Sequence, residues 1–127
     1  IGQVAEDDQA QEQELLSHVW VWEFTQYDAE RGARPLQGDD YSLSFEDRNV
    51  IYASALCGKK KGVYNLRGKS MSIEMKRLNW FKCRNDKDFQ VFLGDLQRGT
   101  EFFIAEGQLK IPLSTNAGIM YFRKIKR

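Results

Sequence analysis

The sequence predicts a mainly β domain of the α+β class: a small antiparallel rolled sheet or open barrel of about eight strands with one inserted helix. Two observations predict this fold. The 127 residues, of which 42% are hydrophobic and 13% aromatic, suffice for one domain with a substantial core. Short runs of alternating apolar and polar residues also follow one another between turn residues, which is typical of an antiparallel meander.

The first 18 residues differ in charge from the rest of the chain. They contain no lysine or arginine and carry −5, so residues 19–127 carry +6 if the whole chain carries +1. We therefore expect two units, an acidic leader or short N-terminal helix over 1–18 and a β-barrel domain over 19–127. The acidic residues of the leader are Glu6, Asp7, Asp8, Glu12 and Glu14.

The first expected strand covers 19–27. Trp20, Trp22 and Phe24 alternate with other residues there, so we expect them to share one face of the strand. The polar stretch 28–40, with two glycines and a proline, predicts a long loop. Further strands are expected at 41–45, 49–53, 62–66, 70–75, 101–105, 108–113 and 118–122.

One segment has the period of a helix instead of a strand. Its apolar residues between Phe89 and Leu96 follow the spacing i, i+3, i+4, i+7, which predicts an amphipathic helix with one buried face. Asn85 or Asp86 is placed to cap its start, and Gly99 to end it. We expect this helix to cover one end of the barrel.

The two cysteines allow a single crosslink. Cys57 follows an expected strand and Cys83 precedes the helix, so a disulfide would join the helix entry to the middle of the meander. Closing a loop of about 27 residues would stabilise the fold by roughly 3.5 kcal/mol. Two buried free thiols of a cytosolic protein are the alternative. A redox pair is a weaker one, because the C-x-x-C spacing is missing.

Several short motifs occur in a fixed order from the first strand to the last. They are Trp20 with Trp22, Leu43 with Phe45, Ala55-Leu56-Cys57-Gly58, Gly62-Val63-Tyr64, the Gly68-Lys69 turn, Met71 with Ile73, Cys83, the hairpin from Phe103 to Ile111, and Phe122-Arg123. Together they resemble the META domain of HslJ-like proteins, over roughly residues 19–123. The chain departs from this family at Leu56-Cys57-Gly58, where Gly-Cys-Asn is common, and at the lysines 59–61 that follow.

The resemblance implies a compartment and a kind of function. It implies that Cys57 and Cys83 form a disulfide and that the protein lies in a bacterial cell envelope, in the periplasm or as an outer-membrane lipoprotein. The family is non-enzymatic, and its members are linked to stress responses. The chain begins with Ile1, so we expect a signal peptide or a lipidated residue that anchors the protein to a membrane to lie upstream, if the protein has one.

Few residues are suited to catalysis. His18 is the single histidine, which makes a zinc centre or a histidine-dependent triad hard to build. Asp39 and Asp40 are neighbours and would point to opposite sides of a strand. The sequence has neither a phosphate-binding G-x-x-x-x-G-K-[ST] loop nor an H-E-x-x-H motif. We expect no enzyme activity, no catalytic residue, no metal and no cofactor.

The segment 59–84 is the basic part of the chain and contains our candidate interaction loop. Its residues are Lys59, Lys60 and Lys61 together with Trp80 and Phe81. The alternative is structural: lysines that protect strand edges, and aromatic rings that pack under the helix. We expect a monomer whose partner is an unidentified envelope protein or lipid. Nucleic acid is not expected, because one Trp-Phe pair is a weak basis for base stacking.

Three functions remain open from the sequence. The first is a non-catalytic cell-envelope domain that binds or stabilises another envelope component. The second is a small-barrel carrier of a lipid or other apolar ligand, which a core filled by Trp20, Trp22, Phe45, Tyr64 and Phe103 would exclude. The third is an inhibitor of a secreted hydrolase, acting through the loops near Lys59 or Trp80.

Overall fold

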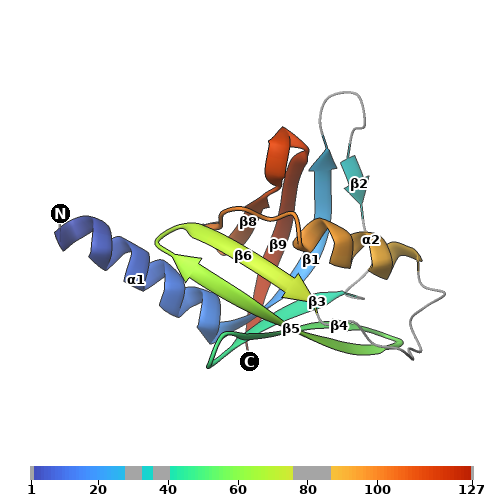
Figure 1. Cartoon of the computed structure of the whole chain (residues 1–127), viewed down its shortest axis with the longest axis horizontal. Coiled ribbons are helices and arrows are strands. Elements are labelled where there is room, and N and C mark those ends of the chain that lie inside the picture. The colour runs from blue at the N-terminus through green and yellow to red at the C-terminus, as the bar shows by residue number, and fades with distance from the viewer. Residues whose placement is uncertain (1, 28–32, 36–40, 76–86, 127) are drawn as a thin grey trace.

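The computed structural model describes residues 2–27, 33–35, 41–75 and 87–126. The chain begins with a helix, continues through six strands, and returns through a second helix to three more strands (Figure 1). The elements are α1 (Gly2–Ser17), β1 (His18–Tyr27), β2 (Ala33–Pro35), β3 (Ser42–Glu46), β4 (Val50–Ala55), β5 (Gly58–Arg67), β6 (Ser70–Met75), α2 (Lys87–Leu96), β7 (Phe103–Ala105), β8 (Gln108–Pro112), a 3₁₀ turn (Ser114–Asn116) and β9 (Gly118–Lys126).

The strands form one antiparallel sheet in the order β6-β5-β4-β3-β1-β9-β8-β7, with β2 paired to the end of β1. This curled half-barrel confirms the predicted fold class, including the inserted helix and the N-terminal helix. Two details differ from the sequence prediction. The short strand β2 lies within the expected loop 28–40, and β5 begins at Gly58, four residues earlier than expected.

The two ends of the sheet meet where β6 begins. Ser70 forms an isolated antiparallel bridge with Glu101, just before β7. The Met71 amide donates to the Thr100 carbonyl at 2.8 Å, and the Phe102 amide donates to the Lys69 carbonyl at 3.0 Å. The sheet therefore curls until its edges join at this point, which protects part of each edge from pairing with another chain.

Aromatic side chains fill the inside of the sheet. Trp20, Trp22, Phe45 and Phe122 are fully buried. The Trp22 ring stacks on Phe92 of α2, with 4.8 Å between ring centroids. Every apolar position predicted for the buried face of α2 is buried, which confirms the helical period read from the sequence.

The structure corrects two residues that we expected on the core face. The register of β1 against β9 shifts between Trp22 and Phe24, which marks a β-bulge at Glu23. One extra residue turns the following side chains to the opposite face, so Thr25 is buried and Phe24 lies on the outer face. Phe103 also lies on the outside, 37% exposed.

A glutamine side chain attaches the C-terminal half of α1 to the barrel. It forms the two hydrogen bonds with one strand residue that a neighbouring strand would otherwise form. The Gln11 amide donates to the Ile104 carbonyl and accepts from the Ile104 amide, both at 2.9 Å. Leu15 is fully buried, and its carbonyl accepts a hydrogen bond from the Trp20 indole at 3.0 Å. Neither helix that the structure describes is long and apolar enough to cross a membrane.

Candidate functional site

A row of aromatic and cationic side chains crosses the outer face of the sheet from β7 to β1. We call Phe103, Lys110, Tyr121 and Phe24, with Lys69 at one end, the aromatic row. Phe103 lies opposite Lys110, Lys110 opposite Tyr121, and Tyr121 opposite Phe24 in the strand registers. Four strands span about 14 Å across the sheet, so the row is long enough to contact a segment of another macromolecule.

Each lysine of this row lies over a ring, and the last two rings stack on each other. The Phe24 and Tyr121 rings stack with centroids 4.5 Å apart and an interplanar angle of 15°. Lys110 Nζ lies 5.7 Å from the centroid of Tyr121, and Lys69 Nζ lies 5.6 Å from that of Phe103. At exposed sites such cation–π contacts stabilise a fold by about 0.5–1 kcal/mol each. The row therefore strengthens the sheet, and it also presents ammonium groups beside apolar surface.

The bulge at Glu23 builds one end of the aromatic row. It is held on the inside by a 2.9 Å hydrogen bond from the Trp22 indole to Thr25 Oγ1, and both residues are fully buried. The Gln108 amide donates to Glu23 on the outside at 3.4 Å. Bulges often re-aim a side chain at functional positions, and this one places Phe24 against Tyr121 on the outer face.

The arrangement of the row limits what it can bind. The Phe24 and Tyr121 rings stack on each other and a lysine lies over Phe103, so each of these rings already uses one face in a contact within the row and has at most one face left for a flat base. The ammonium groups can instead donate to carboxylates, while ring edges and the exposed part of Phe103 offer apolar contact. This combination suits an acidic protein segment that also bears apolar side chains.

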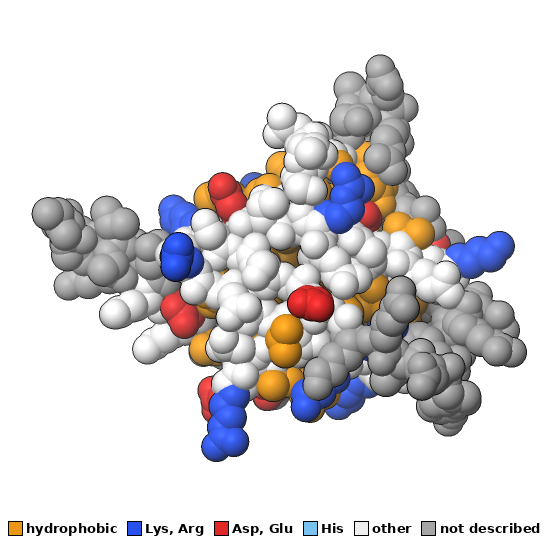
Figure 2. All heavy atoms as spheres, in the orientation of Figure 1, with side chains coloured by type: hydrophobic (Ala, Val, Ile, Leu, Met, Phe, Trp, Pro, Cys, Tyr) orange, Lys and Arg blue, Asp and Glu red, His pale blue; other side chains and the backbone are white. Residues whose placement is uncertain are grey.

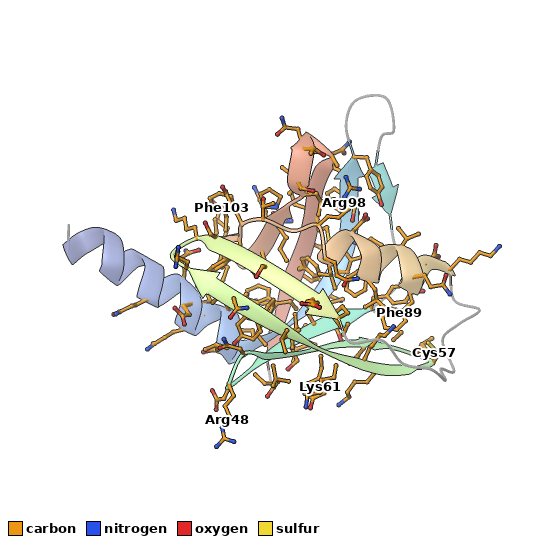
Figure 3. All side chains as sticks on the ribbon, viewed as in Figure 1. Arg48, Cys57, Lys61, Phe89, Arg98 and Phe103 are labelled. Atoms are coloured by element: carbon orange, nitrogen blue, oxygen red, sulfur yellow. The ribbon has the colours of Figure 1, made fainter. Side chains whose placement is uncertain are left out.

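The predicted lysine run does not form a loop, because it lies within β5. Lys59 and Lys61 lie on the outer face, with Lys59 Nζ 5.1 Å above the Tyr52 ring, whereas Lys60 alternates to the opposite face. In Figure 3, Lys61 and Phe103 lie on different sides of the molecule. The basic residues also do not converge on the face shown in Figure 2, where Lys and Arg side chains are spread along the outline.

The other predicted site residues have mixed outcomes. Cys57 is half-buried in the turn between β4 and β5 and packs against the core, at the end of the barrel where α2 begins (Figure 3). Cys83, Trp80 and Phe81 lie outside the described residues, so the disulfide and the apolar part of the interaction loop stay predictions. Leu56, beside Cys57, is 88% exposed.

Of the three residues considered for catalysis, the structure describes only His18. His18 Nδ1 lies 3.2 Å from the Glu14 carbonyl, and its ring meets Trp20 edge-on. Asp39 and Asp40 lie outside the described residues. In the described ranges, no three histidine, cysteine or acidic side chains lie close enough to hold a metal ion.

Two buried polar contacts were not anticipated from the sequence. The Tyr27 hydroxyl donates to Asp95 Oδ2 at 2.6 Å, which ties the nearly buried carboxylate of α2 to the end of β1. The Tyr64 hydroxyl donates to the Glu46 carbonyl at 2.8 Å. Burial, and then the nearby charge of Glu12, raises the pKa of Tyr64 to about 12. Both contacts need residues from distant segments, so no local pattern indicated them.

Comparison with solved structures shows the same fold in other proteins. A DUF4847 family protein from Bacteroides vulgatus has a TM-score of 0.67 and 13% sequence identity, covering 91% of this chain and 98% of that one. A protein from Burkholderia xenovorans has a TM-score of 0.64 and 19% identity, covering 91% and 86%. A third structure, determined by NMR, has a TM-score of 0.53 and 18% identity.

These likenesses show the fold alone, because the identities are low. No protein-family model matches the sequence, and no curated protein matches it. The resemblance to the META domain therefore stays a prediction.

Proposed function

We propose that this protein is a non-catalytic domain of the bacterial cell envelope that binds another envelope protein through the aromatic row. The observation that carries the proposal is the row itself: Phe24 is turned outward by a bulge to join Tyr121, with Lys110 and Lys69 beside the rings. Aromatic and cationic side chains are enriched in protein interfaces, where rings supply apolar area and cations supply specificity.

The packing of the barrel favours this function over that of a carrier. Four of the five residues that would fill the interior do so: Trp20, Trp22 and Phe45 are fully buried and Tyr64 is nearly so. An acyl chain would have to displace these side chains, and opening a packed aromatic core costs several kcal/mol. Phe103, the fifth, lies on the outer face and becomes part of the aromatic row.

Envelope location is part of the proposal and rests on the expected cysteine pair and the META resemblance. Alkylation of the native, exported protein, followed by mass measurement, checks it. We expect no added mass before reduction and two alkyl groups after reduction and unfolding, from Cys57 and Cys83. Two alkyl groups on the unfolded but unreduced protein would contradict the pairing.

A photocrosslinking experiment tests where the partner binds. Phe103 and Val63 are both 37% exposed, and they lie in different strands of the outer face, so they form a matched pair. Each is replaced in turn by benzoylphenylalanine and illuminated in intact cells. We expect a discrete crosslinked protein from position 103 and none from position 63. The same product from both positions, or from position 63 only, would refute the row as the interface.

The apolar loop predicted from the sequence provides a further arm of this experiment. Benzoylphenylalanine at Trp80 or Phe81 tests whether that segment belongs to the interface. A product from position 80 or 81, without one from position 103, would move the interface from the aromatic row to this loop.

A further inference from the structure

A pocket of 330 Å³ lies beside the aromatic row, where β1 ends and β9 begins, at the top of Figure 1. Three of its described lining residues, Gln26, Ile119 and Pro112, lie opposite one another in the registers of β1, β9 and β8. Each is two residues along its strand from a member of the aromatic row, so all three lie on the outer face with the row. The pocket and the row therefore form one continuous surface.

The rest of the described lining is consistent with a pocket that opens on the outer face. The Tyr27 hydroxyl is bonded to Asp95 of α2 and Leu113 is buried in the core, so neither side chain is assigned to a ligand. No described lining residue comes from α2, which covers the inner face. Asn116, in the 3₁₀ turn between β8 and β9, closes one end of the pocket.

The lining suits an apolar side chain that is presented by a peptide. Ile119 and Pro112 are half-buried and offer apolar walls, and none of the described lining side chains is charged. The exposed amide groups of Gln26 and Asn116 can bond to a peptide backbone. Gln26 Nε2 donates to the Tyr27 carbonyl at 3.2 Å, which leaves Gln26 Oε1 as an acceptor. The volume is at the lower end of the range for small-molecule sites, so it fits one large side chain.

The turn beside the pocket is held in place by backbone hydrogen bonds. The Leu113 amide donates to the Gly118 carbonyl and the Ser114 amide to the Arg98 carbonyl, both at 2.8 Å. Between these bonds, Thr115 has φ 57° and ψ 31°, a left-handed conformation that is rare for a β-branched residue. Strained positions of this kind cluster at binding sites, and a wall fixed in advance loses little conformational entropy when a ligand binds.

The aromatic row places a charge at a fixed distance from the pocket. Lys110 is two residues from Pro112 on β8, which is about 7 Å along a strand. In an extended peptide, side chains two residues apart lie on the same side and are separated by the same distance. A peptide that lies along β8 and β9 can therefore place an acidic side chain at Lys110 and an apolar side chain in the pocket.

We infer that the partner of the aromatic row binds through an extended segment that carries an acidic and an apolar residue two positions apart. The acidic side chain pairs with Lys110, and the apolar side chain fills the pocket between Ile119 and Pro112. The amide groups of Gln26 and Asn116 bond to the backbone of the segment. This rests on the proposed function, because it names the chemistry of the partner that the row binds. Both chain directions satisfy the spacing.

Peptides of defined sequence test the inference in NMR titrations of the ¹⁵N-labelled protein. The probes are acetyl-Gly-Asp-Ser-Leu-Gly-amide and acetyl-Gly-Leu-Ser-Asp-Gly-amide, one for each chain direction. We expect one of them to shift the amide signals of Gln26, Lys110 and Ile119, with a dissociation constant on the order of 1 mM. The same peptide with alanine in place of leucine should bind at least about fivefold more weakly, because the apolar anchor is lost. A peptide with adjacent aspartate and leucine, acetyl-Gly-Ser-Asp-Leu-Gly-amide, should bind at least about threefold more weakly, because neighbouring side chains point to opposite sides.

Two isoleucines of β9 provide matched variants. Both lie on the outer face, and Ile125 is six residues from Ile119, about 20 Å along the strand. Ile119→Ala should weaken binding of the leucine peptide at least about fivefold and that of the alanine peptide less than about twofold, because only leucine reaches the pocket wall. Ile125→Ala should change both by less than about twofold. The amide spectrum shows whether each variant is folded, and the peptide series on the wild type decides the question if one is not.

Equal affinities of the leucine and alanine peptides, or equal losses in Ile119→Ala and Ile125→Ala, would overturn the inference. If the shifts are then confined to Lys110 and Tyr121, the row still binds the peptide and the proposed function stands. The absence of saturable shifts with both probes would also overturn the inference, and crosslinking from position 103 then decides whether the proposed function falls with it. Shifts of the Ile119 amide that depend on protein concentration, without peptide, would assign the pocket to a second copy of this chain instead.

Discussion

The Trp22 indole donates a 2.9 Å hydrogen bond to the Thr25 hydroxyl, three residues along the same strand. In a regular strand these two side chains would point to opposite faces, and the bulge at Glu23 is what brings both inside. The same bulge moves Phe24 to the outer face, where it stacks on Tyr121. One local irregularity therefore completes the core and builds one end of the aromatic row.

Replacing Thr25 tests the hydrogen bond that spans the bulge. Thr25→Val keeps the shape of the side chain but leaves the buried Trp22 N–H without its acceptor, so we expect unfolding to need about 1–3 kcal/mol less free energy. Urea denaturation measures this difference. Thr100→Val, on an exposed threonine, should change stability by less than about 0.5 kcal/mol, and equal effects would contradict the role of the bond.

Gln11 tests the attachment of α1 to the sheet edge. Gln11→Ala leaves the amide and the carbonyl of Ile104 without their bonding partner, and we expect a loss of about 1–3 kcal/mol in urea denaturation. Gln11→Glu keeps the acceptor but loses the donor and should also destabilise the fold. Gln13→Ala is the control, because Gln13 is exposed on the same helix. A Gln11→Ala protein as stable as Gln13→Ala would rule out this attachment.

Two glycines should respond in opposite directions to the same substitution. A Cβ at Gly62 would lie 2.6 Å from the Glu74 carbonyl of the neighbouring strand, so Gly62→Ala should destabilise the fold by about 1–3 kcal/mol. A Cβ at Gly94, on the exposed side of α2, would meet no atom within 4 Å. Gly94→Ala should therefore stabilise the fold by about 0.5–1 kcal/mol. Thermal unfolding measures both. A Gly62→Ala protein as stable as the wild type would contradict the close packing of β5 on β6, and a destabilised Gly94→Ala protein would contradict the free space at Gly94.

Tyr64 gives a prediction for alkaline pH. Its pKa is raised from 10.0 to about 12, because burial and nearby carboxylates disfavour the phenolate. The folded protein holds this proton more tightly than the unfolded chain, so the contribution to stability is complete below pH 10 and is lost between pH 10 and about 12. Tyr64→Phe cannot titrate. It should be less stable than the wild type at pH 8, by about 1 kcal/mol for the lost bond to the Glu46 carbonyl.

The measurement is urea denaturation of both proteins from pH 8 to pH 12. The difference in unfolding free energy between wild type and Tyr64→Phe should shrink as the pH rises through 10. A difference that stays constant over this range would show that Tyr64 ionises no later in the folded protein than in the unfolded chain.

The strands and α2 could be predicted from the sequence, because the spacing of apolar residues follows which side of each element is buried. Met71 and Ile73 alternate into the core of β6, and Phe89 with Leu96 marks the buried face of α2. The lysine run 59–61 was predicted to lie in a loop because charged residues are typical of turns. Here the turn has only two residues, Leu56 and Cys57, and pairing with β4 resumes at Gly58.

The aromatic row could not be predicted from the sequence by the same reasoning. Its members come from four strands and one turn, and strand register decides which side chains lie opposite one another. A period of two places Phe24 on the same face as Trp22, and the burial of Thr25, which reveals the bulge, is visible only in the structure. Long-range register and one inserted residue are properties of the folded sheet that no local pattern contains.

A charge reversal at two matched lysines tests whether the aromatic row is the binding face. Lys110 lies over Tyr121 in the row, and Lys59 lies over Tyr52 on another part of the sheet, with Nζ 5.7 and 5.1 Å from the ring centroids. Purified Lys110→Glu and Lys59→Glu proteins are compared with wild type for the partner that they retain from a solubilised envelope, in amounts measured by mass spectrometry. We expect at least about a tenfold loss for Lys110→Glu and less than about a twofold loss for Lys59→Glu. Equal retention by the two variants, or a loss confined to Lys59→Glu, would contradict this role of the row.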